Sequence, residues 1–398
     1  MKTIANRHQP KNSFIDTTKY EDDDGILLDI GYQSIRKINL TQYNNYQFIQ
    51  KLYISNNSIE SLPDPSSLQH LEYLACGHNN LTAIPFYSNL TEIYAQNNKL
   101  ISMSTYDNSD LKILDVSNNL NIDIDYTFNN LIELFVQKCN LSKIIPSNYP
   151  NVKILDCSKN NLNSFSRMNS LIELDISNNK ITNFPIIPNI RYLAINYNPI
   201  ISLPNMPLLK ELNCQNCLLK SIPDLPKLKY LFGKNNSISS IGNLDSIYVM
   251  DVINNNITDL VVSKSCEKLY ISENNISEIK FNSKSRIRSI VCNYNTAKII
   301  NYKEIQKSPH SIINTLEFDK YSLYMEKLVE IFNKKAVMQY LTIVSQLQPA
   351  EFYQYIDKLI ENALQISNKE NISPETIALI KKKLLHQYRH LLVCNIDF

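Results

Sequence analysis

The chain of 398 residues carries a formal net charge of +2, and 43% of its residues are hydrophobic. This near balance of charge argues against a nucleic-acid-binding or membrane-surface protein, and no stretch approaches the roughly 18 consecutive apolar residues that span a bilayer. Residues 1–20 are polar and lack the apolar centre of a signal peptide, so we expect a cytoplasmic protein.

Residues 1–24 are predicted to be a disordered N-terminus, because they are polar and end in the acidic run Glu21 to Asp24. Residues 25–48 follow as an N-terminal cap that contains a degenerate repeat, with apolar Ile26, Leu28 and Ile30. Such a cap is needed because the free edge of a parallel sheet attracts other strands.

Residues 49–302 repeat one pattern about thirteen times, with a spacing of 19 to 22 residues. The copy that begins at residue 171 shows the pattern, with apolar first, fourth, sixth and eleventh positions and an amide at the ninth: Leu171, Leu174, Ile176, Ile181 and Asn179. The copies begin at residues 49, 71, 90, 111, 131, 152, 171, 190, 209, 228, 247, 266 and 287. A fixed period in this range predicts a solenoid, in which each repeat stacks on its neighbours.

The position of a residue within its repeat predicts the role of its side chain. Positions four and six alternate as a short strand requires, and with position one they are expected to point into a shared core. Position nine is Asn in eleven repeats, and an inward amide can bond the backbone groups exposed where the chain leaves the strand. These residues are Asn57, Asn79, Asn98, Asn119, Asn160, Asn179, Asn198, Asn236, Asn255, Asn274 and Asn295. We therefore expect a structural ladder of amides without a ligand role.

The cysteines follow the same register. Cys214 and Cys217 form a CxxC pair, a spacing that elsewhere indicates metal or redox chemistry. Here Cys214 takes the sixth, core position and Cys217 replaces the ladder asparagine, so packing of a small apolar side chain explains both. The sequence has no second CxxC to complete a zinc site, and we predict neither a metal nor a cofactor.

Several repeats continue after position eleven with an apolar residue, a proline and, shortly afterwards, a second proline. Examples are the segments 184–188, 203–207 and 222–226. Proline fixes φ and removes a hydrogen-bond donor, which favours an extended return path over a helix. The short repeats also leave little room for a helix on the convex side.

This pattern resembles the leucine-rich repeat family, and within it the short-repeat subclass found in bacterial effector proteins. The resemblance implies an α/β fold: a leucine-rich repeat solenoid with a parallel concave β-sheet and a mostly irregular or extended convex side. The richness in Asn, Ile, Tyr and Lys also resembles proteins from AT-biased genomes such as those of large DNA viruses. For a viral or effector protein, the expected location is the cytoplasm of the host cell.

After residue 302 the period stops and apolar residues recur at helical spacing. Helices are predicted over about 320–346, after Pro349, and from Ser373, where a capping residue precedes Pro374 at the first helical position. Residues 303–398 are thus expected to form a small α-helical C-terminal region. It is either a cap for the solenoid or an accessory domain, and the sequence leaves both interpretations open.

The resemblance also implies an alternative function, because some short-repeat effectors carry a helical ubiquitin-ligase domain with a catalytic Cys-x-Asp motif. The candidate here is Cys394, but Asp397 lies one residue too far for that motif. The sequence contains no P-loop, GxGxxG, HExxH or GxSxG motif. We therefore predict a protein without enzymatic activity, with a ligase or other enzyme in the C-terminal region as the alternative.

The concave face is the predicted functional surface. Positions three and five of each repeat are expected to point outward from the strand, where acidic side chains gather in repeats four to seven and aromatic side chains lie further along. The aromatics would anchor a protein partner, and the acids would select one with a basic patch. The simpler interpretation is that these side chains only keep an exposed strand soluble. The predicted partner-binding residues are Asp115, Glu133, Phe135, Asp156, Glu173, Asp175, Tyr192, Tyr197, Tyr230 and Phe232.

Overall fold

The computed structural model describes residues 20–22, 25–43, 45–103, 106, 109–281, 286–291 and 298–300. The chain divides into two compact units, Met1–Ile312 and Ile313–Phe398. The predicted helical region 303–398, with Cys394, lies outside the described residues, and so does the ladder residue Asn295.

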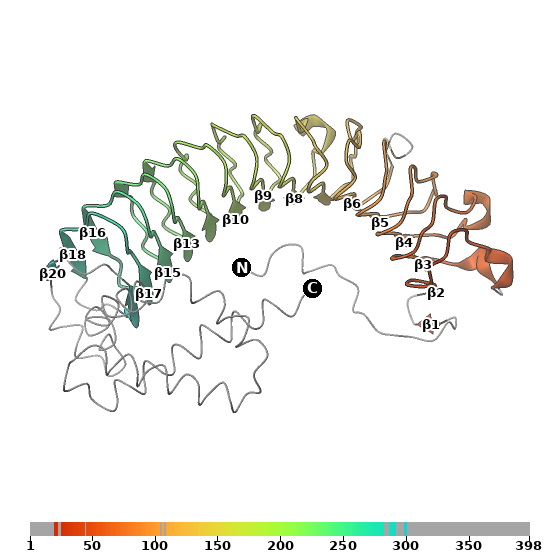
Figure 1. Cartoon of the computed structure of the whole chain (residues 1–398), viewed down its shortest axis with the longest axis horizontal. Coiled ribbons are helices and arrows are strands. Elements are labelled where there is room, and N and C mark those ends of the chain that lie inside the picture. Colours follow the sequence, from red (N-terminus) through yellow and green to blue (C-terminus); the bar gives the residue numbers. More distant parts are fainter. Residues whose placement is uncertain are drawn as a thin grey trace, which may run out of the picture. The chain divides into compact units, whose positions relative to one another are not determined.

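One long sheet runs through the described part of the first unit, with 15 strands in the order of the chain. Its strands are parallel except for the first pair. They are β1 (Tyr20–Asp22), β2 (Gly25–Asp29), β3 (Lys51–Tyr53), β4 (Tyr73–Ala75), β5 (Glu92–Tyr94), β6 (Ile113–Asp115), β7 (Glu133–Phe135), β8 (Ile154–Asp156), β9 (Glu173–Asp175), β10 (Tyr192–Ala194), β11 (Glu211–Asn213), β13 (Tyr230–Phe232), β15 (Val249–Asp251), β17 (Lys268–Tyr270) and β19 (Ser289–Val291). From β3 onward the strands follow an arc and line its inner side, so this sheet forms the concave face of the solenoid (Figure 1).

The repeat register determines these strands. Each strand from β3 onward covers positions three to five of its repeat, and equal positions of adjacent repeats pair, as Leu155 with Leu174 and Leu174 with Leu193. Side chains at positions one, four and six are buried in one continuous core, for example Leu171, Leu174 and Ile176. The predicted solenoid and its core positions are therefore confirmed.

The amide ladder is also confirmed. Asn160 shows its geometry: its Nδ2 donates to the carbonyl of Cys157 in its own repeat (2.9 Å) and to that of Val136 in the preceding repeat (2.8 Å). Its Oδ1 accepts from the N–H of Leu141, position eleven of the preceding repeat (3.0 Å). The ten described ladder asparagines make this set of contacts, which satisfies backbone groups where each strand ends.

The convex side consists mainly of extended segments and short 3-10 turns, as predicted. The turns are η2 (Leu40–Gln42), η3 (Tyr46–Phe48), η4 (Pro65–Ser67) and η6 (Pro146–Asn148). Among the described residues, no helix has the length and apolar character needed to cross a membrane.

Further along the chain the convex segments pair into short parallel sheets that the sequence did not predict. They are β12 (Ser221–Ile222) with β14 (Ser240–Ile241), and β16 (Asp259–Val262), β18 (Glu278–Phe281) and β20 (Lys298–Ile300). The last proline of the repeats is Pro226. From β14 onward every residue of the return segments has an N–H to donate, so extended segments that stack in register can pair. Strand β12 precedes Pro223, and its Ile222 carbonyl accepts the N–H of Gly242 (2.8 Å).

The N-terminal cap contains the predicted degenerate repeat. Strand β2 pairs in parallel with β3, and Ile30 and Ile35 take the places of positions six and eleven against Asn57. The prediction of disorder to residue 24 is wrong for Tyr20–Asp22, which form β1 and pair antiparallel with β2. The physical reason is that β2 is an edge strand, and β1 satisfies its otherwise unpaired backbone groups.

Candidate functional site

Nine of the ten predicted partner-binding residues lie on the strands of the concave sheet, and Tyr197 lies just past β10. Asp115, Glu133, Glu173, Asp175, Tyr192 and Phe232 are half-buried, and Tyr230 is 37% exposed. The expectation of outward exposure is wrong for Phe135 and Asp156, which are only 7% and 6% exposed. Both occupy position five of their repeats.

Two acidic residues of repeats six and seven lie side by side. Asp156 on β8 pairs in register with Asp175 on β9. Burial, together with the nearby charges of Asp175 and Asp115, raises the pKa of Asp156 to about 7, although hydrogen bonds from Ser158 lower it. Burial also raises the pKa of Asp175. This pair therefore holds a proton more tightly than ordinary aspartates, and a cation that docks beside it would release that proton.

Position five has a structural function that the sequence analysis missed. The Oδ1 of Asp156 accepts the N–H of Ser158 (2.9 Å), and Asp175 and Asp115 accept from Ser177 (2.9 Å) and Ser117 (3.0 Å) in the same way. Each carboxylate thus stabilises the turn that follows its strand, because an Asp side chain commonly accepts the backbone N–H of the residue two positions later. The recurring Asp-x-Ser triplet was the signal for this function.

A group of three tyrosines at the start of the concave face was also missed. The rings of Tyr53 and Tyr73 lie 4.9 Å apart, and those of Tyr73 and Tyr94 lie 5.2 Å apart. The hydroxyl of Tyr94 donates to Oε2 of Glu92 (3.1 Å). These residues alternate between positions five, three and five on successive strands. Their adjacency follows from the register, which places positions three and five of neighbouring repeats side by side.

Position eight of each repeat directly precedes the ladder residue at position nine. In the described repeats it has a left-handed backbone with φ between 53° and 59°. Seven of these twelve positions are Asn, which tolerates this conformation best among residues with a side chain. Tyr197 departs from the rule, with φ 58° and 55% exposure. Lys138 and Lys159 depart from it in repeats five and six and are exposed. These three exceptions border the predicted acidic and aromatic residues, whereas the other two, His78 and Glu273, lie in repeats two and twelve.

The described cysteines are free thiols in buried positions. Cys139 and Cys217 replace the ladder amide, and their Sγ atoms donate to the carbonyls of Val116 (3.2 Å) and Ile195 (3.3 Å). Burial raises the pKa of Cys139 to about 12 and that of Cys217 to about 11, and the pKa of Cys214 is also raised by burial. In the part of the chain that the structure describes, no group of three or more His, Cys, Asp or Glu is placed to hold a metal ion.

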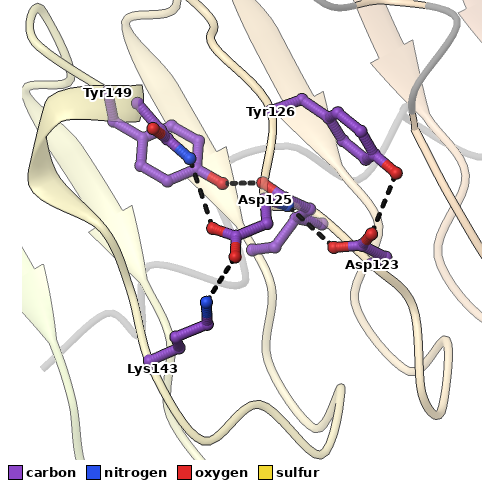
Figure 2. A network of polar contacts seen from close by, with 7 residues as sticks. Asp123, Asp125, Tyr126, Lys143 and Tyr149 are labelled. Carbon is purple, nitrogen blue, oxygen red and sulfur yellow. Dashed lines mark hydrogen bonds and ion pairs between the residues drawn. The ribbon is translucent and has the colours of Figure 1, made fainter.

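A hollow of about 230 Å³ lies between repeats four and five, beside Asn121 and Cys139. Among its lining residues, Lys143 pairs with Asp125 (2.5 Å), the Tyr149 hydroxyl donates to a backbone carbonyl, and Asp123 accepts from the hydroxyl of nearby Tyr126 (2.9 Å; Figure 2). These polar groups satisfy one another. The hollow therefore reflects a local lapse of the repeat: Asn121 stands at position eleven, where other repeats have an apolar residue, and its N–H donates to the carbonyl of Cys139 (3.3 Å).

Comparisons with known proteins agree with this geometry. Family models described as "Leucine Rich repeats (2 copies)" and "Leucine Rich Repeat" match residues 47–89 and 170–193. The repeats of this chain are leucine-rich repeats. A putative leucine-rich repeat protein of Acanthamoeba polyphaga mimivirus is 37% identical over 81 residues, a match that covers 20% of this chain and 19% of that relative.

Solved structures show the same solenoid. YopM from Yersinia enterocolitica matches with a TM-score of 0.51 and 25% identity, over 67% of this leucine-rich repeat protein and 61% of YopM. The functional domain of InlJ from Listeria monocytogenes matches with a TM-score of 0.57 and 23% identity, over 71% of this chain and 70% of that domain. The likeness to InlJ concerns the fold alone. The match covers about a fifth of the viral relative and under two thirds of YopM.

Proposed function

We propose that this leucine-rich repeat protein is a non-catalytic scaffold that binds a protein partner on the concave face of repeats four to ten. The leucine-rich repeat solenoid is usually a non-enzymatic scaffold. The observation that carries the proposal is the coincidence of two features in this region. Partly exposed aromatic and acidic side chains line the strands, and Tyr197 holds an exposed aromatic ring on a left-handed backbone that disfavours it.

The aromatic residues supply the anchors in this proposal. Tyr192, Tyr230 and Phe232 lie on β10 and β13, with one strand between them, and burying such rings against a partner gives a large share of binding energy. The acids on β6 to β9 select a basic partner and speed its encounter. The six cysteines that the structure describes are free thiols, which supports the expected cytoplasmic location because unpaired thiols persist in a reducing compartment.

The test is affinity capture from the native cell with matched variants of the full chain. We expect Tyr192→Ala combined with Phe232→Ala to abolish capture of the partner that wild type retains. Ile186→Ala combined with Val261→Ala is the control, because both side chains are exposed and lie outside the concave strands. Circular dichroism should show the same fold for both double variants.

The same experiment separates the scaffold from the enzyme. Cys394→Ser should leave capture and any cellular effect of the protein unchanged. Concave variants that behave like wild type, together with a loss of the cellular effect in Cys394→Ser, would contradict the scaffold proposal and support an enzymatic C-terminal region.

A further inference from the structure

The concave sheet and its edges carry charges of opposite sign. At positions three and five from β6 to β11 there are six acidic residues and no Lys or Arg, although the whole chain has a net charge of +2. We call these acids the floor: Asp115, Glu133, Asp156, Glu173, Asp175 and Glu211. The floor is therefore a local concentration of acidic residues, of which Asp156 is buried and the other five are half-buried, on a chain with a slightly positive net charge.

One edge of the floor carries cations at position two, immediately before the strands, interrupted by Ile132 and Ile172 in repeats five and seven. We call this row the rim: Lys112, Lys153, Arg191, Lys210 and Lys229. All are exposed except Lys210, which is half-buried. The backbone holds the row in line, because the N–H of Lys210 donates to the carbonyl of Arg191 and that of Lys229 to the carbonyl of Lys210, both at 2.8 Å. Three cations thus lie on adjacent repeats.

The opposite edge is also basic in the middle of the site. Lys138 and Lys159 occupy position eight of repeats five and six, next to β7 and β8. Their left-handed backbones, with φ 55° and 53°, would be accommodated better by the Asn found in most repeats. The charge of Lys159 lowers the pKa of the Asp175 carboxyl, against the larger effect of burial that raises it. The floor is therefore bordered by cations on both sides.

We infer that this face docks a protein segment whose central row of Lys or Arg side chains is bordered on both sides by Asp or Glu side chains. The inference rests on the proposed function and specifies its partner. Central cations meet the floor and flanking acids meet the two basic edges, so attraction is greatest in one alignment. A uniformly basic surface would be repelled by the edges, and a nucleic acid would be repelled by the floor.

The spacing of the floor defines a suitable probe. Five steps between adjacent strands from β6 to β11 span roughly 24 Å at about 4.8 Å each. An α-helix rises about 5.4 Å per turn, so about 16 helical residues cover the floor and present nearly one side chain to each strand. A helix with a Lys stripe between two Glu stripes therefore has the required charge pattern.

The experiment measures binding of two synthetic helical peptides to the full chain by fluorescence anisotropy at low and high salt. Both contain the same Lys, Glu and Ala residues, arranged as stripes in one peptide and scrambled in the other. We expect the striped peptide to bind about tenfold or more tightly than the scrambled one at low salt, with the difference reduced at high salt. Equal binding of the two peptides would overturn the inference.

Matched variants locate the binding. Glu173→Gln with Asp175→Asn should weaken binding of the striped peptide about tenfold, and both changes keep the side-chain shape. Lys153→Glu with Arg191→Glu should also weaken it, but should strengthen binding of a peptide with Lys alone. Asp259→Asn with Glu60→Gln, outside the concave strands, should change neither. If floor variants and this control behave alike, the inference is refuted.

The outcome also separates this inference from the proposed function. Suppose the peptides are not distinguished, while Tyr192→Ala with Phe232→Ala still abolishes capture of the natural partner. The scaffold proposal then stands and the charge pattern of the partner is wrong. If capture of the natural partner is insensitive to the aromatic, floor and rim variants together, the concave face is not the binding surface and both fail.

Discussion

Replacing Asp156 by Asn tests the physical account of the acidic strands. Asp156 is 6% exposed and has a pKa of about 7, whereas an ordinary aspartate has a pKa of about 4. The folded state therefore binds the proton more tightly than the unfolded state, and the wild type loses stability as the pH rises from about 4 to about 7. Asn cannot ionise and retains an oxygen for the Ser158 N–H, so the variant should escape this loss.

The magnitude follows from the pKa. One pKa unit corresponds to about 1.4 kcal/mol, so a difference of about three units sets a ceiling of about 4 kcal/mol above pH 7. Because the repulsion is shared with Asp175, we expect about half of this, or roughly 2 kcal/mol, from the single substitution. The gain should be near zero at about pH 4 and reach its full value above about pH 7.

The assay is the free energy of unfolding in urea for wild type and Asp156→Asn across this pH range. Asp29→Asn is a matched control, because Asp29 makes the same turn contact with Gly31 (2.9 Å) but is exposed. The control should show no growth of stability with pH relative to wild type. A variant that is less stable than wild type above pH 7, or a pH-independent difference, would refute the reasoning.

Three further predictions follow from the repeat geometry. Cys217→Asn should leave the free energy of unfolding unchanged or raise it by up to about 1 kcal/mol, because Asn is the usual ladder residue. Cys214→Asp should lower it by more than about 3 kcal/mol, because it buries a carboxylate. Stoichiometric zinc in the wild type that is lost in Cys217→Asn would contradict this packing account. Tyr197→Asn should raise the melting temperature, by relieving about 1 kcal/mol of backbone strain, and yet weaken partner capture; a lower melting temperature would argue against the strain. Gly242→Ala should lower the free energy of unfolding by about 1–3 kcal/mol, because a Cβ there would lie 2.6 Å from Oδ1 and 2.7 Å from the backbone N of Asp224; an unchanged urea midpoint would contradict it.

The sequence predicted the concave sheet well because the repeat links position to environment. A residue at position four, such as Leu174, must be buried once neighbouring repeats stack in register, and an amide such as Asn179 must then face the carbonyls at the strand ends. Both inferences require only a period and the alternation of a strand. They hold for each described repeat that has the consensus residues. Where Cys217 replaces the ladder Asn, its thiol still donates to the carbonyl of Ile195 in the preceding repeat.

Features that depend on neighbouring repeats were harder to predict. Phe135 and Asp156 occupy the same position as the more exposed Phe232 and Asp251, so the position within a repeat does not by itself determine burial. The strands β16 and β18 belong to successive repeats, and they can pair because the return segments of both repeats lack proline. A prediction made from each repeat by itself assigns the same environment to the same position in every repeat, whereas in the stacked structure that environment differs between repeats.

Departures from the repeat fall into two kinds, and the difference is informative about function. Cys139 and Asn121 both depart from the consensus, but the thiol of Cys139 keeps a ladder contact and its carbonyl accepts the N–H of Asn121, so folding alone explains the pair. Tyr197, Lys138 and Lys159 gain no such compensation on their left-handed backbones, and their side chains are exposed. A sequence free of other constraints would place Asn at all three positions, as seven other repeats do. The other two replacements, His78 and Glu273, lie in repeats two and twelve, so three of the five lie beside the floor and the aromatic strands, which is a reason to look for the partner there.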